Sequence, residues 1–349
     1  MTAPTTDIAI DDPSWPGGNP SEVAPGLMLC AAVTVAAFAL AEIEQRLFGH
    51  PWLEPLVLAI LVGAAIRAVW SPGARWTCGI NFGAKTLLEV AVVLLGASVG
   101  MATLTSLGGA FVLGIFLLVA VAIGVGFGLG RALGLNPRIA MLVACGNAIC
   151  GNSAIAAVAP VIDADGEEIA TSIAFTAVLG VIVVLTLPLL GVLMQMSALQ
   201  FGALAGLTVY AVPQVLAAAA PFGAAAAQTG TVVKLVRVLM LGPVVFTLSL
   251  IAGRRGQAGT PGLHRLVPWF IIGFIAMIGL RSTNLIPQAA LPGLATASGL
   301  LTVTAMAALG LQTDIRAVAR AGGRVVAAVV FSLAALLILA LLLIRLMEL

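Results

Sequence analysis

The sequence predicts an all-α integral membrane protein with about eleven transmembrane helices. Of its 349 residues, 61% are hydrophobic and only 9% are charged, whereas an average soluble domain is roughly 25% charged. Apolar runs of about 20 residues, the length that an α-helix needs to cross the hydrocarbon core, recur from Pro25 to the C-terminus. These runs are apolar on every face, whereas the strands of a membrane β-barrel alternate polar and apolar residues. The spanning segments are therefore expected to be helices.

The apolar runs and the polar breaks between them divide the chain into a short tail and one membrane domain. Residues 1–24 carry four acidic residues, no Lys or Arg and no short apolar core, so we expect a cytoplasmic tail and no signal peptide. Residues 25–349 are expected to form one polytopic transporter domain. We place its helices at residues 25–41, 53–69, 81–100, 110–130, 139–160, 169–194, 201–220, 231–252, 266–280, 291–311 and 325–346.

The basic residues predict the orientation, because short cytoplasmic loops are enriched in Lys and Arg. With the N-terminus inside, the cytoplasmic loops hold Arg67, Arg75, Lys85, Arg131, Arg138, Arg254, Arg255, Arg265, Arg316, Arg320 and Arg324. The opposite loops carry acidic groups, including Asp163, Asp165, Glu167 and Glu168, and the basic exceptions Arg46 and Arg281. The sequence therefore predicts a multi-pass protein of a bacterial inner membrane, with a cytoplasmic N-terminus and an external C-terminus.

Composition and motifs argue against several classes of function. The net charge is only +2 and no run of like charges occurs, so no nucleic-acid partner is expected. The four cysteines lack metal-ligand spacing, and the two histidines, His50 and His264, fall in predicted loops. We therefore expect no metal, no cofactor and no enzymatic activity. The lipid bilayer is the expected surrounding, and a homodimer is allowed but not required.

The fifth predicted span contains the most unusual stretch, Gly146-Asn147-Ala148-Ile149-Cys150-Gly151-Asn152-Ser153. Two Gly-Asn pairs are poor helix formers at mid-membrane. A broken backbone is tolerated there only where protein or water satisfies its amides, and a new helix start would offer N–H groups to an anion. The alternative is close packing of an intact helix through small residues. We favour the break, with Asn147, Gly151, Asn152 and Ser153 as binding residues.

Two further spans contribute candidate residues. In the seventh, Pro213 interrupts an apolar run, and Tyr210 and Gln214 lie one turn apart, where they line a cavity or accompany an ordinary kink. In the eighth, Lys234 and Arg237 share one helical face. Intramembrane cations are costly and are candidates for anion binding, with snorkelling to the boundary as the alternative.

Glu89 is the one acidic candidate, about midway along the third predicted span. It could pair with Arg237, carry a coupling proton, or pair with Lys85 one turn before it. The residues alone do not rank these three roles.

Two weak internal echoes bear on whether the chain contains an inverted repeat, as many transporters do. One relates residues 87–109 to residues 301–323, and its two helices run in opposite directions in the predicted topology. The other relates Gly146, Ala157, Thr171 and Leu179 to the residues 60 positions later, Gly206, Ala217, Thr231 and Leu239. Its helices run in the same direction in that topology, which does not fit inversion. Chance similarity between Ala-, Leu- and Gly-rich helices also explains both.

The string GNAICGNSAIAAVAPVI, followed by VVKLVRVLML and ALGLQTDIRAVARAGG, resembles the bacterial YeiH family of inner-membrane proteins, commonly labelled sulfate exporters. The family is grouped with the cation:proton antiporter and anion transporter superfamily. This resemblance implies two inverted repeats, with crossed broken helices in a core domain set against a panel domain. It implies a second crossing point in the tenth helix, near Thr296, Ser298 and Thr302.

The sequence departs from that family at one position of interest. Many relatives carry a His followed by an acidic residue where this chain has Tyr210 and Ala211. A His there could titrate near neutral pH, whereas Tyr could not. A proton-coupling role for that pair is therefore not carried over to this chain.

Together these patterns predict a secondary transporter for a small anion, with sulfate, sulfite or an organosulfonate as first guesses and small carboxylates next. The anion would lie at mid-membrane against Asn147–Ser153 and Arg237, with Lys234 adding charge and Tyr210 and Gln214 shaping the cavity. The alternatives are an ion-coupled cation/proton antiporter that uses Glu89, and an anion channel.

Overall fold

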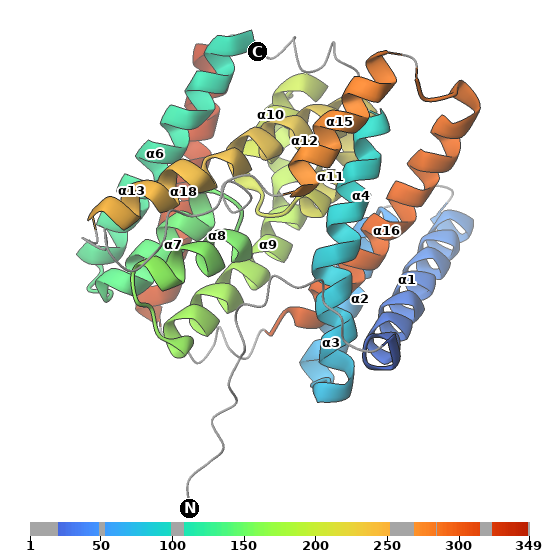
Figure 1. Cartoon of the computed structure of the whole chain (residues 1–349), viewed down its shortest axis with the longest axis horizontal. Coiled ribbons are helices and arrows are strands. Elements are labelled where there is room, and N and C mark those ends of the chain that lie inside the picture. Colours follow the sequence, from blue (N-terminus) through green and yellow to red (C-terminus); the bar gives the residue numbers. More distant parts are fainter. Residues whose placement is uncertain are drawn as a thin grey trace, which may run out of the picture.

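The computed structural model describes residues 20–48, 53–98, 108–251, 269–283, 285–314 and 323–347. Within these ranges every regular element is helical, which confirms the predicted all-α class (Figure 1). Seven described helices or helix pairs are long and apolar enough to cross a membrane. They are α1 (Pro20–Phe48), α3 with α4 (Ala74–Phe82 and Leu88–Leu95), α6 (Gly108–Ala132), α9 (Gly166–Leu193), α12 with α13 (Ala224–Leu239 and Leu241–Ile251), α16 (Leu291–Gln312) and α18 (Gly323–Leu346).

The remaining apolar helices are shorter, and the predicted count of eleven spans is not confirmed. Two of them, α2 (Pro55–Val69) and α15 (Trp269–Ser282), lie alongside the long helices. The other four are α7 (Pro137–Ala148), α8 (Asn152–Val158), α10 (Ala198–Thr208) and α11 (Val212–Ala219), where the fifth and seventh spans were predicted. Residues 1–19 of the predicted tail lie outside the described residues. Its last five residues, 20–24, begin α1.

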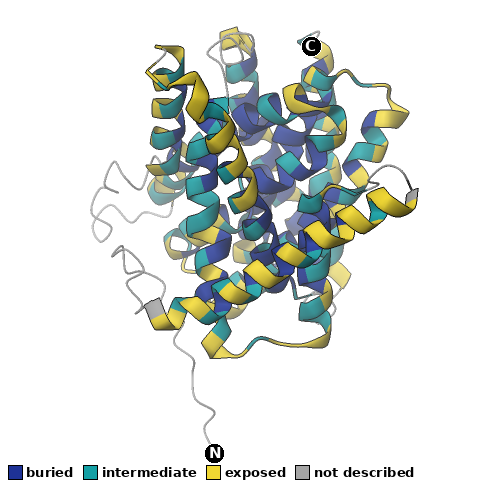
Figure 2. Ribbon diagram, turned by 90° about the vertical axis from the view of Figure 1, so that its right-hand side faces the viewer, coloured by how far each residue is buried: buried dark blue, intermediate teal, exposed yellow. Residues whose placement is uncertain are grey.

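Large apolar side chains cover the outside of the protein, as contact with lipid requires. On α6, Leu113 and Leu117 are 68% and 66% exposed, and on α18, Ile338 and Leu342 are 65% and 64% exposed. Figure 2 shows the buried residues running through the middle of the molecule. The helices therefore form a multi-pass membrane protein.

The helices group into two bundles, which Figure 1 shows on opposite sides of the molecule. The first bundle contains α1–α4, α15 and α16. Its helices touch at glycines: Gly26 of α1 lies against Gly79 of α3, and Gly63 of α2 lies against Gly310 of α16. A Cβ on Gly63 would come 2.6 Å from the carbonyl oxygen of Ala307, so only glycine permits this approach.

The second bundle contains α6–α12 and α18. Gly126 and Gly130 of α6 pack against Ala144 and Ala140 of α7. The two bundles meet where α11 contacts α2 and α16, and where α9 contacts α2. The second bundle thus resembles a core and the first a panel, the division that the family resemblance implies.

The predicted fifth span does not cross the membrane but folds back on itself. Asn136, at the start of α7, donates from Nδ2 to Oε1 of Glu168, at the start of α9, over 2.7 Å. Across the turn, Ile155 of α8 packs against Gly146 of α7. Because α7 and α9 begin at the same level, α7 and α8 form a re-entrant pair, here called the first hairpin (residues 137–161).

The predicted seventh span folds back in the same way. The ring of Phe201, in the first turn of α10, stacks on the ring of Phe222, just after α11, with centroids 3.8 Å apart. Gly202 and Gly206 of α10 lie against Ala226 and Gly230 of α12, so those two helices run in parallel. The chain must therefore return along α11, and α10 with α11 forms the second hairpin (residues 198–222).

The two hairpins enter the bundle from opposite faces. Between them lies α9, whose 28 residues span about 42 Å at the usual rise per residue. One face, here called the Arg131 face, holds the end of α6 and the opening of the first hairpin. The other, the Ser197 face, holds the N-cap of α10 and the opening of the second hairpin.

In this arrangement the two segments that are similar at a separation of 60 residues run in opposite directions, as an inverted repeat requires. Each unit consists of a hairpin that ends in a short Ala-Pro 3-10 turn, followed by a 28-residue helical segment. The breaks fall at residues 149–151 and 209–211, 60 positions apart. The expected second crossing point in the tenth helix is wrong: α16 runs unbroken from Leu291 to Gln312, through Thr296, Ser298 and Thr302.

The hairpins move one predicted loop to the other side of the protein and leave the side of the other loops unchanged. Replacing two crossings by hairpins keeps six described basic residues on the Arg131 face, namely Arg67, Arg75, Lys85, Arg131, Arg138 and Arg324. The acidic group at residues 163–168 moves to that face as well. Because acidic residues contribute little to topology, the pattern of Lys and Arg still agrees with the fold. Arg254, Arg255, Arg265, Arg316 and Arg320 lie outside the described residues.

This topology can be tested with single cysteines introduced into a cysteine-free background. A membrane-impermeant maleimide should label Arg138→Cys and Glu167→Cys from the same side of sealed vesicles, and Gln195→Cys from the opposite side. The reason is that the first hairpin returns to its starting face while α9 crosses. Labelling of Arg138→Cys and Glu167→Cys from opposite sides would show that α7 and α8 cross the membrane.

Candidate binding site between the two hairpin tips

The first hairpin is broken where the sequence predicts a break. Helix α7 ends at Ala148 and α8 begins at Asn152. Gly151 has φ of 68°, a conformation that favours glycine. A Cβ added to Gly151 would lie 3.3 Å from Cβ of Tyr210, so the tip of the first hairpin lies directly against the second.

The second hairpin is also fully broken, rather than kinked. Val209 and Ala211 are extended, and Pro213 lies in the first turn of α11, where its missing N–H costs no helical bond. Oε1 of Gln214 accepts a hydrogen bond from the backbone N–H of Ala211 over 3.2 Å. Proline and glutamine therefore start a new helix, and Gln214 acts as a buried cap.

Asn147 and Tyr210 join the two tips. The Tyr210 hydroxyl donates to Oδ1 of Asn147 over 2.9 Å, and Nδ2 of Asn147 donates to the carbonyl oxygen of Val329 in α18 over 3.1 Å. Asn147 is 1% exposed and Tyr210 is 3% exposed. The side-chain oxygen and nitrogen of Asn147 are thus both bonded to protein groups. The pair Asn147 and Tyr210 therefore links the two hairpins to each other and to α18.

Arg237 of α12 caps the first arms of both hairpins. Its Nε and Nη2 donate to the carbonyl oxygens of Ala148 and Asn147, over 2.7 and 2.6 Å. Its Nη1 donates to the carbonyl oxygens of Gly206 and Val209, each over 3.2 Å. These carbonyls end α7 and α10, where a helix leaves its last acceptors unpaired and carries partial negative charge. The guanidinium therefore supplies charge and hydrogen bonds to two helix ends at once.

Lys234, one turn earlier on α12, approaches only the first hairpin. Its Nζ donates to the carbonyl oxygen of Ile149 over 2.5 Å. An ammonium has three N–H groups and a guanidinium five, so Lys234 keeps two donors and Arg237 keeps one beyond these bonds. Both side chains are 0% exposed, which excludes the predicted alternative that they snorkel to the boundary.

Three residues at the tip of the first hairpin retain access to the outside of the protein. Cys150 and Asn152 are half-buried and Ser153 is exposed. Oδ1 of Asn152 accepts a hydrogen bond from the hydroxyl of Thr176 in α9 over 2.5 Å. The predicted binding residues thus separate into buried ones that hold the tips together and accessible ones beside them.

Glu89 lies apart from this cluster, in the first bundle. Its Oε2 accepts a hydrogen bond from the indole Nε1 of Trp269 in α15 over 2.7 Å. Among the described residues it forms no ion pair within 4.0 Å with either Lys85 or Arg237. The structure therefore does not place it with the hairpin tips.

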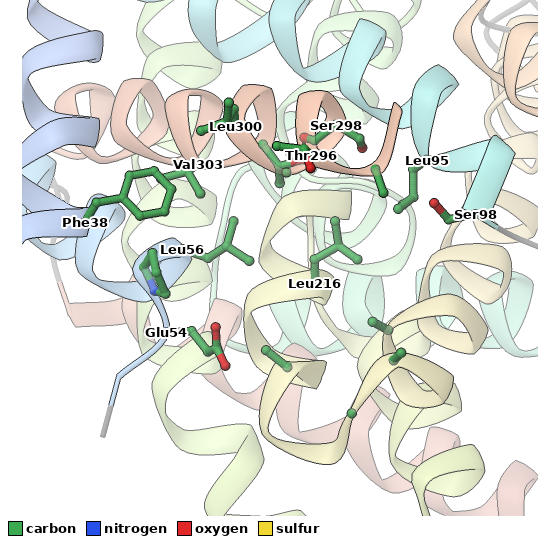
Figure 3. A pocket seen from close by; sticks show the side chains of 18 residues that line it. Phe38, Glu54, Leu56, Leu95, Ser98, Leu216, Thr296, Ser298, Leu300 and Val303 are labelled. Carbon is green, nitrogen blue, oxygen red and sulfur yellow. The ribbon is translucent and has the colours of Figure 1, made fainter. Parts of the chain in front are cut away.

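A pocket of about 490 Å³ lies between the bundles, towards the Ser197 face (Figure 3). Leu216 of α11 and Ala220, just after α11, form one wall, and α16 forms the opposite wall with Thr296, Ser298 and Thr302. The three hydroxyls donate to backbone carbonyls, those of Pro292, Ala91 and Ser298 respectively. Because their hydrogens are used in these bonds, the three hydroxyls can offer the pocket only acceptor oxygens.

The sequence singled out the two cationic side chains that are buried between the hairpins, but it did not indicate their partners. The acceptors of Lys234 and Arg237 are backbone carbonyls, which carry no signal in the residue types. The described residues contain no cluster of three or more His, Cys, Asp or Glu side chains that could hold a metal ion.

The link between the hairpins can be tested with Tyr210→Phe. This change leaves the buried Oδ1 of Asn147 without its donor and should lower the unfolding free energy by about 1–3 kcal/mol. The measurement is the thermal unfolding midpoint of the purified protein in detergent. Thr247→Val, which removes an exposed hydroxyl that bonds within its own helix, should have no such effect. Equal stability of Tyr210→Phe and wild type would contradict the role given to this hydrogen bond.

Comparison with known proteins places the chain in a family. A family model described as "Conserved hypothetical protein 698" matches residues 25–329. A UPF0324 membrane protein of Brucella melitensis is 57% identical over 314 residues, which cover 90% of this chain and 88% of the relative. Its counterpart in Agrobacterium fabrum is 55% identical over 313 residues, or 90% of each chain. One from Bacillus cereus is 32% identical over 302 residues, or 86% of this chain and 87% of the relative. The chain therefore belongs to the UPF0324 family of membrane proteins, which is the YeiH family indicated by its motifs.

Proposed function

We propose that this protein is a secondary transporter that carries a small anion across a bacterial inner membrane, with its N-terminus in the cytoplasm. The observation that carries the proposal is the pair Lys234 and Arg237, fully buried where two opposed hairpins meet. Among the described residues no carboxylate lies within 4.0 Å of either. Buried cations without a carboxylate partner favour a bound anion, because intramembrane charge is otherwise costly.

The hydrogen bonds suggest different roles for the two cations. Arg237 uses four of its five N–H groups on the hairpins and serves mainly as a structural cation. Lys234 retains two N–H groups and lies beside the accessible tip of the first hairpin, so it is the better ligand for the anion. Asn152 and Ser153 add polar groups there, while Asn147, Gly151, Tyr210 and Gln214 shape the site.

The proposed substrates are small oxyanions. Sulfate, sulfite and an organosulfonate are the first candidates and a small carboxylate follows, since three N–H donors suit several oxygens of one anion. Both cations are enclosed in this conformation. The anion therefore gains access when the second bundle moves against the first, at the interface of α11 and α9 with α2 and α16.

The rival reading as a cation/proton antiporter receives less support. It needs a carboxylate at the hairpin tips, whereas Glu89 bonds to Trp269 in the other bundle. An anion channel would share the site but would show neither saturation nor counterflow. The proposal assigns no enzymatic activity, and transport would draw on an ion gradient or exchange.

Ligand-dependent stability tests the proposal. A ligand that binds only the folded protein stabilises it by about 2.7 kcal/mol at a hundredfold excess over Kd. We expect one of sulfate, sulfite, taurine or acetate to raise the unfolding midpoint saturably at constant ionic strength, and Lys234→Met to abolish the shift.

The matched control is Lys85→Met, which removes an exposed Lys of the first bundle and should keep the shift. The same shift in wild type and Lys234→Met would remove Lys234 from the site. Its absence with every anion in wild type would count against an anion carrier.

A further inference from the structure

The strongest remaining feature is a cage of backbone carbonyl oxygens at the centre of the second bundle. Three come from the first hairpin, at Asn147, Ala148 and Ile149, and two from the second, at Gly206 and Val209. Nitrogen atoms of Lys234 and Arg237 lie 2.5–3.2 Å from them. Carbonyl oxygens are ligands that Na⁺ and K⁺ accept, and the C-terminal ends of broken helices hold such ions in ion-coupled transporters.

We propose that Lys234 and Arg237 occupy this cage in place of a coupling metal cation, so that transport does not draw on a Na⁺ or K⁺ gradient. The inference rests on the proposed transport function and concerns its coupling. A cage that closes on two covalently attached cations keeps them throughout the cycle. The positive charge therefore travels with the hairpins rather than entering from one side of the membrane.

The internal repeat supports a dedicated role for the two cations. At the positions 60 residues earlier, α9 carries Ala174 and Ala177, so only the second unit supplies charge. Yet that charge serves both hairpins, because Arg237 bonds to carbonyls of each. The two side chains thus supply positive charge to the carbonyl ends of α7 and α10, as a metal ion bound between those ends would.

The surroundings lack the anionic ligands that a dissociable metal ion would need. Glu168 is the one acidic residue that is buried in the described ranges, and it lies at the opening of the first hairpin. There it bonds to the side chain of Asn136 and to the backbone N–H of Asp165. With Lys234 and Arg237 already in the cage and no carboxylate beside them, an added metal ion would be a third cation and would face repulsion from both without compensation.

The experiment measures thermal unfolding while the cation is varied and the anion is held constant. Sodium, potassium and methylammonium are each compared with N-methyl-D-glucamine, which is too large for the cage. Wild type should show no saturable shift with any of them. Lys234→Ala, which vacates the part of the cage beside Ile149, should be less stable and should regain about 2 °C or more with methylammonium, the size of shift that roughly 1 kcal/mol produces in a large domain.

Lys85→Ala is the control and should not respond to methylammonium. Saturable stabilisation of wild type by Na⁺ or K⁺ would overturn the proposal, and so would a Lys234→Ala variant that gains nothing from methylammonium. The wild-type arm needs no variant, so the proposal stays testable if Lys234→Ala does not fold. Because the anion is held constant, an unexpected response to cations would not change the result of the anion experiment. Likewise, a failed anion experiment would not change the result of this cation experiment.

Discussion

The interaction on which the rest of the structure depends is the bonding of Arg237 to the ends of α7 and α10. A helix that stops inside a membrane leaves carbonyl oxygens that lipid cannot satisfy, so protein groups or cavity water must bond to them. Here two helices stop at the same place, and one guanidinium supplies hydrogen bonds and charge to both. Arg237 therefore bonds the ends of both hairpins to α12, and the hydrogen bond from Tyr210 to Asn147 adds a direct link between their tips.

This constraint also explains how the second bundle is held together. Asn147, Tyr210 and Thr176 add side-chain bonds around the tips, and glycines bring α10 close to α12. The first bundle is fastened separately, at its own glycine contacts. Two bundles that are each tightly packed, and that meet through few elements, are suited to move against one another as units.

The sequence predicted the helical membrane fold and the break at residues 146–153, because apolar length and Gly-Asn pairs are local signals. It did not predict that the chain turns back, since residue types at a break do not indicate the direction of the next helix. Pro213 therefore suggested a kink, although it begins α11. The 60-residue echo was discounted for the same reason: counting each hairpin as a crossing gave its helices the wrong relative direction.

The structure brings some of the predicted site residues together and separates others. Lys234, Arg237, Asn147 and Tyr210 come together as expected, but Glu89 lies in the other bundle. Their roles depend on backbone acceptors and on depth, which only the fold determines. The pattern of basic loops survived the change in topology, because two hairpins replace two crossings and the faces of the later loops do not change.

The most direct test of this account is a set of short distances from the Arg237 guanidinium, measured by solid-state NMR in lipid bilayers. Protein with ¹⁵N-labelled arginine and ¹³C-labelled valine or alanine carbonyls would report the approach to Val209 and Ala148. The account predicts dipolar contacts with both hairpins, and their loss in Arg237→Lys. Contact with only one hairpin, or with a carboxylate instead, would contradict it.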